Sequence, residues 1–251
     1  MILIGTDPSR LFPYIPRSDY LLIAGSDYIS HVRHRAKKFD PTKHCFNPLS
    51  GMTYHKARQM RDLFSATFPE SESTLTKSGG LRHILKTLVR DKPATLDDLA
   101  PAPSKTDTGL QWAHEKVEEL LLSPILSRVL ESNLYVFKGT IHAVLDRESL
   151  GDFDCRLLGR LLIMHYPGTV VVPDFGFYAL PAHVSLIRER RLIASIRELA
   201  EVPELSTDVL FSEEVLPARC TADDAETLAT YRSGHRKGTE GYSMYVENAI
   251  A

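Results

Sequence analysis

The stretch Thr169-Val170-Val171-Val172-Pro173-Asp174 decides the fold class that we predict for this chain. A run of β-branched residues is typical of a strand buried on both faces, as strands of parallel sheets are. Proline and aspartate end the run, so a carboxylate follows the carboxyl end of the strand. Open α/β sheets bind their ligands at that end, which makes Asp174 the first candidate functional residue. The alternative is that Asp174 serves only as a turn residue before Gly176.

Strand and helix patterns alternate on both sides of this stretch. The alternation predicts crossover connections and hence an α/β fold: a doubly wound, mainly parallel sheet with helices on both faces. We expect Gly79-Gly80 to separate two helices. The expected strands are 1–4, 20–24, 140–145, 169–172 and 192–196, and the expected helices are 54–68, 81–90, 110–131 with a break near Ser123-Pro124, 150–165, 182–190 and 223–231.

Length and composition favour one globular domain. A chain of 251 residues with 43% hydrophobic and 25% charged residues can bury one sizeable core, so we expect residues 1–251 to form a single α/β domain. Within it, the polar and proline-rich residues 93–109 predict a surface loop or an insertion.

Charge and cysteine content bound the partners and the compartment. A net charge of -2 gives no overall attraction to nucleic acid or to a membrane surface, so any site for a polyanion must be a local patch. Three widely spaced cysteines form no disulfide framework, which indicates a reducing compartment. No apolar run is long enough to span a bilayer. We therefore expect a cytoplasmic protein without a membrane span.

Several short motifs occur in an order that resembles one class of ATPase. Phe39-Asp40-Pro41 and Phe46-Asn47-Pro48-Leu49 follow the second expected strand, and the strand ending at Asp174 precedes residues 192–202 and the stretch Asp224-Ala225-Glu226-Thr227-Leu228-Ala229. This order is similar to that of the DNA-pumping P-loop ATPases of the FtsK and HerA class. The class includes conjugative coupling proteins and the packaging ATPases of membrane-containing viruses.

The resemblance implies a P-loop NTPase-like fold and a function in DNA translocation or genome packaging in a virus or mobile element. It implies ATP and Mg²⁺ as cofactors, with Asp174 as the catalytic carboxylate that holds the metal. It also implies DNA as a partner, and assembly as a homo-oligomer or as a complex with an active ATPase.

Two parts of the hydrolytic apparatus depart from the pattern of this class. Where a phosphate-binding loop would follow the first strand, the chain has Gly5-Thr6-Asp7-Pro8-Ser9-Arg10. Asp7 adds a like charge beside phosphate and Pro8 removes an N–H donor. Phe175 stands where a glutamate would polarise the attacking water. The candidate nucleotide-binding residues are therefore Gly5, Thr6, Ser9 and Arg10, with Arg10 in place of the usual lysine.

These departures leave the question of catalysis open. The alternative to a weakened ATPase is a non-catalytic DNA-binding or scaffold protein that retains the ATPase fold. A third alternative is an unrelated enzyme that binds a small substrate near Asp174.

A basic segment between His31 and His44 is the candidate nucleic-acid site. Cations clustered over a short window can lie along phosphates, and each contact makes binding more dependent on salt. The alternative is a solvated face. The candidate residues are Arg33, Arg35, Lys37, Lys38 and Lys43.

Overall fold

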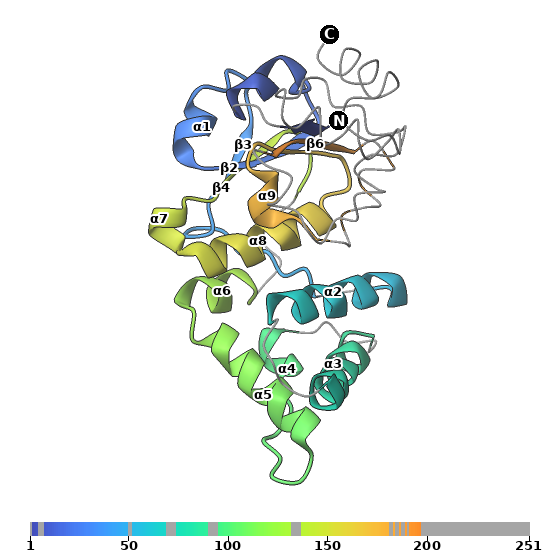
Figure 1. Ribbon diagram of the computed structural model, residues 1–251. Helices are drawn as coiled ribbons and strands as arrows, with labels where there is room; N and C mark the ends of the chain where they lie inside the picture. Colours follow the sequence, from blue (N-terminus) through green and yellow to red (C-terminus); the bar gives the residue numbers. More distant parts are fainter. Residues whose placement is uncertain are drawn as a thin grey trace, which may run out of the picture. The chain divides into compact units, whose positions relative to one another are not determined.

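The computed structural model describes residues 2–4, 8–49, 52–68, 74–89, 95–131, 137–180, 183, 186, 189 and 191–196 (Figure 1). The chain divides into two compact units. The sheet unit comprises Met1–Lys38, Lys138–Asp146 and Leu162–Ala251, and the helical unit comprises Phe39–Phe137 and Arg147–Leu161. We expected a single domain over residues 1–251, so the division into two units was not predicted.

A six-stranded sheet with the order β1-β6-β5-β2-β4-β3 forms the framework of the sheet unit. The pairs β1–β6, β6–β5, β5–β2 and β2–β4 are all parallel. This is the expected α/β fold with a mainly parallel sheet, while the more specific P-loop NTPase-like fold stays a prediction. The strands are β1 (Ile2–Ile4), β2 (Tyr20–Ala24), β3 (Lys37–Phe39), β4 (Ile141–Val144), β5 (Thr169–Val172) and β6 (Leu192–Ile196).

Both faces of β2 are covered. Tyr20, Leu22 and Ala24 share one face and belong to a buried cluster with Val171 of β5. The partly buried side chains packed against that cluster come from the 3-10 helix η1 (Pro8–Tyr14), from α1 (Ser26–Ser30), from β6 and from Val32. Every residue of β2 is buried, so its opposite face is covered as well. The continuous apolar run of β2 therefore forms a strand that is buried on both faces, as such a run predicts.

The helical unit is built from short amphipathic helices. Thr53 caps α2 by accepting a hydrogen bond from the backbone N–H of Lys56, and Ser123 caps α6 in the same way, with Pro124 at its first turn. These findings confirm the expected helix at 54–68 and the break near Ser123-Pro124. The helices are α2 (Tyr54–Thr67), α3 (Thr74–Leu88), α4 (Leu96–Leu99), α5 (Thr108–Leu121), α6 (Pro124–Val129) and α7 (Arg147–Leu150), and α8 (Asp152–His165) runs from this unit into the sheet unit.

The expectation that Gly79-Gly80 separates two helices is wrong, because both glycines lie inside α3. A Cβ atom added at Gly80 would lie 2.3 Å from Cε3 of Trp112 and 2.7 Å from the carbonyl oxygen of Gly109. Gly109 is in α5, so the glycines allow α3 and α5 to approach closely. Their role is helix packing, and it outweighs the poor helix propensity of glycine.

The segment 93–109, for which the sequence predicts a surface loop or an insertion, contains the short helix α4. Leu96 and Leu99 are 3% and 0% exposed, and Thr95 and Asp98 form a reciprocal capping box around α4. The two leucines therefore anchor this part of the segment in the core of the helical unit.

Other expectations fall on residues that the structure does not describe. The expected helix 223–231 lies wholly outside the described residues, and the expected helix 182–190 lies largely outside them. The strand 192–196 is confirmed as β6. Among the helices of the described residues, none is both long enough and apolar enough to cross a membrane.

Candidate functional site at the carboxyl end of the parallel sheet

The order of strands reverses between β2 and β5. The chain passes from β2 to β3 and β4 on one side of β2, and from β5 to β6 on the other side. In open α/β sheets, ligands bind outside the carboxyl ends of the strands at such a switch point. The residues that follow β2, β4 and β5 therefore form the candidate site, which lies entirely within the sheet unit.

The strand register places the carboxyl ends of β1 and β5 on the same side of the sheet. Val172, the last residue of β5, is paired with Ala194 of β6, and Ala194 is paired with Ile2 of β1, so β1 continues two residues beyond that level to Ile4. Only β6 separates β1 from β5. Two strand spacings of about 4.8 Å put these two strands roughly 10 Å apart. Asp174, two residues after β5, and the segment after β1 therefore follow strand ends on the same side of the sheet, and both were predicted to bind nucleotide.

Asp174 occupies the N-cap position of α9 (Phe175–Tyr178), but its side chain does not cap that helix. It is partly exposed, whereas the next residue, Phe175, is fully buried and packs against the ring of His183. Asp174 lies in the turn between β5 and α9, so the structural alternative, a turn residue before Gly176, stays open. Phe175 belongs to the core and provides no second carboxylate.

Asp146 joins the end of β4 to the first turn of α1. Its Oδ1 accepts a 2.6 Å hydrogen bond from the backbone N–H of Ser26. A Cβ atom at Gly25 would lie 3.1 Å from the same oxygen, so the glycine leaves room for the carboxylate. This residue was not among the predicted site residues. Its position directly after an expected strand, like that of Asp174, is a signal that could have identified it.

The segment after β1 folds as the 3-10 helix η1. Ser9 and Arg10 are exposed in η1, whereas Gly5 and Thr6 lie outside the described residues. The carbonyl oxygen of Pro8 accepts a 3.0 Å hydrogen bond from the Tyr28 hydroxyl. This bond ties the start of η1 to α1. Two of the four predicted phosphate-binding residues are thus accessible near the end of β1.

The predicted nucleic-acid residues divide between the two units. Arg33, Arg35, Lys37 and Lys38 are exposed in the sheet unit, and none forms an ion pair with another described residue. Lys37 and Lys38 belong to β3, the last strand in the sheet order. Lysines on an edge strand also hinder unwanted strand pairing, which is the structural explanation for them.

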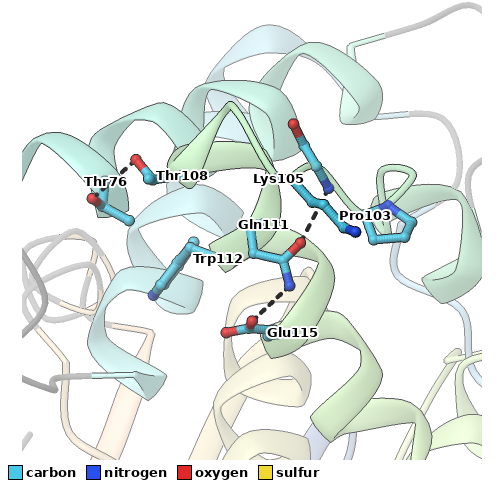
Figure 2. A pocket seen from close by; sticks show the side chains of 8 residues that line it. Thr76, Pro103, Lys105, Thr108, Gln111, Trp112 and Glu115 are labelled. Atoms are coloured by element: carbon cyan, nitrogen blue, oxygen red, sulfur yellow. Dashed lines mark hydrogen bonds between the residues drawn. The ribbon is translucent and has the colours of Figure 1, made fainter.

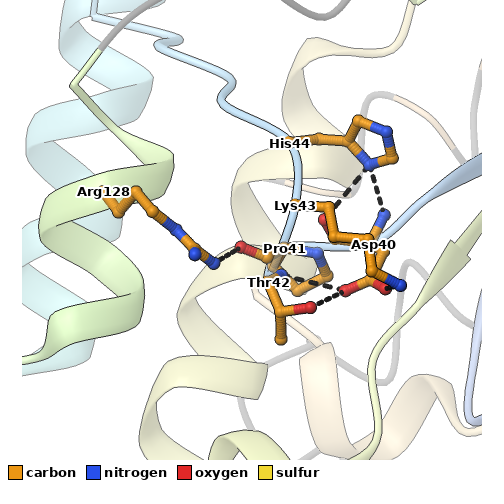
Figure 3. A network of polar contacts seen from close by, with 6 residues as sticks. All are labelled: Asp40, Pro41, Thr42, Lys43, His44 and Arg128. Atoms are coloured by element: carbon orange, nitrogen blue, oxygen red, sulfur yellow. Dashed lines mark hydrogen bonds and ion pairs between the residues drawn. The ribbon is translucent and has the colours of Figure 1, made fainter.

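Lys43 belongs to the helical unit and is already paired (Figure 3). Its Nζ atom lies 3.0 Å from Oδ2 of Asp40, and Oδ1 of Asp40 accepts hydrogen bonds from the backbone N–H and the hydroxyl of Thr42. Partial burial disfavours the charged form of Asp40, but the hydrogen bonds from Thr42 and Lys43 outweigh it and lower the pKa of Asp40 to about 2.

The two proline motifs form turns. Arg128 donates a 2.7 Å hydrogen bond to the carbonyl oxygen of Pro41 (Figure 3), and Asn47 accepts one from the backbone N–H of Leu49 within its own turn. The backbone N–H of Phe46 donates to the carbonyl oxygen of Val129. The described contacts of both motifs are thus hydrogen bonds within the protein.

A buried polar cluster at the start of β2 was also not predicted. The Tyr20 hydroxyl lies 3.0 Å from Nδ1 of His34 and 3.0 Å from Nε2 of His142. Burial raises the pKa of Tyr20 to about 12, and burial together with the nearby His34 lowers the pKa of His142. The three residues come from separate parts of the chain, so no local sequence pattern marks them.

Within the described part of the chain, no group of three or more His, Cys, Asp or Glu side chains gathers as metal ligands. Comparison of the chain with models of known protein families and with curated proteins finds no match. The geometry of the sheet unit is therefore the basis for the function proposed below.

Proposed function

We propose that this chain is a nucleotide-dependent DNA-handling subunit, similar to translocation or genome-packaging ATPases of viruses and mobile elements, with weakened catalysis. The observation that carries the proposal is the parallel pairing of β1 with β6 and of β6 with β5, which puts the carboxyl ends of β1 and β5, and hence Ile4 and Asp174, on the same side of the sheet. A nucleotide with its metal would bridge the ends of β1 and β5 at this edge.

The side chains at this edge fit magnesium-bound nucleotide. Mg²⁺ is usually held by one or two carboxylates, with water and substrate phosphates as its other ligands. A single partly exposed carboxylate at Asp174 therefore suffices on the protein side. Ser9 and Arg10 are exposed after β1 and would face the phosphates. ATP and Mg²⁺ are the proposed cofactors on this basis.

The same edge accounts for weak catalysis. Phe175 has a hydrocarbon side chain with no group to polarise an attacking water, and Pro8 at the start of η1 has no N–H to donate to phosphate. An active ATPase in a mixed complex, or a neighbouring copy in a homo-oligomer, would supply the groups that this chain lacks. DNA is the proposed partner for Arg33, Arg35, Lys37 and Lys38.

The second candidate is a non-catalytic DNA-binding or scaffold protein with the same fold. The hydrogen bond between Tyr28 and the Pro8 carbonyl favours it, because this contact fixes the segment after β1 within the protein. A segment held in this way is less available to wrap around phosphate.

Magnesium-dependent ATP turnover by the purified chain, with and without duplex DNA, separates the two candidates. We expect slow turnover that DNA stimulates and that Asp174→Asn abolishes while the protein stays folded. A folded wild-type protein that neither binds nor hydrolyses ATP, but binds DNA, would establish the scaffold instead.

A further inference from the structure

The pocket between α3 and α5 in the helical unit has polar side chains that are bonded to one another (Figure 2). Thr76 donates a hydrogen bond to Thr108 over 3.3 Å, and Gln111 donates one to Glu115 over 2.6 Å. Trp112, which also lines this pocket, is only 2% exposed. The contacts of these side chains are thus explained by packing within the helical unit.

A different polar cluster, which we call the Tyr20 cluster, lies in the sheet unit and consists of Tyr20, His34 and His142. The Tyr20 hydroxyl lies 3.0 Å from Nδ1 of His34 and 3.0 Å from Nε2 of His142. His142 is paired with Leu22 in the sheet, so its side chain is on the same face as that of Tyr20. Tyr20 is fully buried and His142 is 6% exposed, whereas His34 is only partly buried. The cluster therefore joins the sheet to a residue near the surface.

His34 belongs to the stretch 31–38, in which the side chains alternate between the sheet and solvent. His34 and the residue two positions after it are partly buried, and the residues between and beside them are exposed. The stretch is hydrogen-bonded to the sheet through the contact of His34 with Tyr20 and through the backbone N–H of Lys37, which donates to the carbonyl oxygen of Thr140 over 3.0 Å. The side chains that this arrangement presents to solvent are the proposed DNA-binding cations Arg33, Arg35, Lys37 and Lys38.

The hydrogen bonds of the cluster depend on the protonation of His142. The Tyr20 hydroxyl has one hydrogen to donate, so one of the two imidazole nitrogens that face it accepts that hydrogen and the other donates to its oxygen. A proton on His142 makes Nε2 a donor, and Nδ1 of His34 is then the acceptor that the hydroxyl needs. The proton also places a charge in the interior, and burial, together with the nearby His34, lowers the pKa of His142. Water reaches this charge only if the cluster opens, so protonation of His142 favours release of His34.

The other ionisable groups on the elements that cover this face make their contacts elsewhere. β4, β5 and β6 carry no ionisable side chain apart from His142. Nδ1 of His31 lies 2.8 Å from a carbonyl oxygen of α1, and the Tyr28 hydroxyl is bonded to η1. Within the described residues, the charge that acts on His142 is that of His34. The charged side chains of η1, of α1 and of residues 31–38 are exposed; they are Arg10, Asp27, Arg33, Arg35, Lys37 and Lys38.

We propose that the Tyr20 cluster is a pH-sensitive anchor for the cations of residues 31–38. While His142 is neutral, the cluster holds this stretch against the sheet and keeps its cations in a fixed arrangement. When His142 takes up a proton, the stretch is released and the arrangement is lost. This inference rests on the DNA-binding function proposed above, and it makes Tyr20 and His34 positioning residues.

The test measures duplex DNA binding by the full chain and by Tyr20→Phe, which lacks only the hydroxyl. At roughly pH 7.5 the wild type should bind about threefold to tenfold more tightly, because a stretch that is already ordered loses less entropy on binding. That advantage should narrow as the pH falls to roughly 5.5. The ratio of the two affinities is the readout, since the other histidines gain charge in both proteins. A tyrosine with a purely structural role would give the same ratio at both pH values.

Matched variants separate the anchor from general effects of the sheet unit. His142→Gln keeps an amide that can replace Nε2 in the hydrogen bond but does not titrate. It should bind DNA as the wild type does at roughly pH 7.5 and keep its advantage over Tyr20→Phe at roughly pH 5.5. Tyr166→Phe removes another buried hydroxyl of the sheet unit, which donates to the Gly139 carbonyl oxygen over 2.7 Å, and it should behave as the wild type at both pH values.

His34→Ala opens the anchor from its outer side and serves if urea unfolding shows that Tyr20→Phe does not fold. His34 is partly exposed, so its removal disturbs the core less. The same loss of DNA affinity at roughly pH 7.5 is expected.

The outcomes distinguish the anchor from the DNA function. Equal affinities of the wild type and the anchor variants at roughly pH 7.5, or the same ratio at both pH values, would overturn the anchor and leave the DNA function intact. A folded wild type that binds no DNA at either pH would refute the DNA function, and the anchor with it.

Discussion

The carboxylate of Asp146 accepts a 2.6 Å hydrogen bond from the backbone N–H of Ser26, and so links the end of β4 to the turn after β2. The N-cap residue of α1 is Gly25, which has no side chain to offer. Asp146 therefore provides, from a neighbouring strand, an acceptor for one of the first N–H groups of α1, which have no partner inside the helix. This contact shapes the switch point of the sheet.

Asp146→Ala should lower the free energy of unfolding by about 0.5–2 kcal/mol, the usual cost of losing a helix cap. Asp146→Asn keeps an acceptor oxygen and should lose less. Asp27→Ala, which removes an exposed acid from the first turn of α1, is the matched control and should cost less than about 1 kcal/mol. Urea denaturation measures all three. Equal stability of the Asp146→Ala variant and the wild type would contradict the role of this contact.

Gly80→Ala should destabilise the protein by about 1–3 kcal/mol, because a Cβ atom there would overlap the Trp112 ring and the Gly109 carbonyl. At Gly79 the nearest atom is 3.2 Å away. Gly79→Ala should change stability by less than about 1 kcal/mol, since the helix propensity of alanine offsets the contact. Thermal or urea unfolding gives both values. If Gly80→Ala were as stable as Gly79→Ala, the close packing of α3 on α5 would be refuted.

We expect the free energy of unfolding to decrease as the pH falls below about 6.5, because His142 has a lowered pKa in the folded protein. Burial and the nearby His34 lower the pKa of His142 in the folded state from its ordinary 6.5. The unfolded chain therefore binds a proton that the folded chain does not, and the stability present above pH 6.5 is lost as the pH falls below it. Tyr20 adds to this effect, because protonating His142 would remove one of the two imidazole groups that can accept a hydrogen bond from its hydroxyl.

Urea unfolding at roughly pH 7.5 and roughly pH 5.5 measures this effect. The wild type should lose more stability between the two values than His142→Gln does. The exposed His55 serves as the control, since His55→Gln should retain the full loss. The same loss in all three proteins would show that His142 is not responsible.

Neutralising Lys37 and Lys38 together should weaken duplex DNA binding and reduce its salt dependence, by about one unit of the log-log slope for each lysine that contacts a phosphate. Lys43→Gln should have a smaller effect, because Asp40 already pairs with Lys43. Binding curves at several salt concentrations measure both. If the lysines only protect the β3 edge, the double variant would self-associate and still bind DNA as the wild type does.

The strands of the sheet unit were largely predictable, because runs such as Tyr20–Ala24 and Thr169–Val172 are apolar throughout and end at turn residues. Strands of a parallel sheet are buried on both faces, so they appear in the local sequence as continuous apolar runs. β3 was not predicted, because two of its three residues are exposed lysines at the sheet edge.

Contacts between distant residues were not predictable. Gly79-Gly80 has the local pattern of a helix break, and only its approach to Gly109 and Trp112 explains a continuous α3. Within the candidate site, Asp174 was identified by its place after a strand. The pairing of Asp146 with Ser26, and the placement of the carboxyl ends of β1 and β5 on either side of β6, depend on the strand order, which no short motif encodes.

The most direct test of the account is equilibrium binding of a fluorescent ATP analogue to the purified chain, with and without Mg²⁺, beside Asp174→Asn. We predict magnesium-dependent binding that Asp174→Asn weakens at least about tenfold, because the Asp174 carboxylate is the proposed ligand of the metal. Absence of binding by folded wild-type protein, or equal binding by Asp174→Asn, would contradict a nucleotide site at this edge of the sheet.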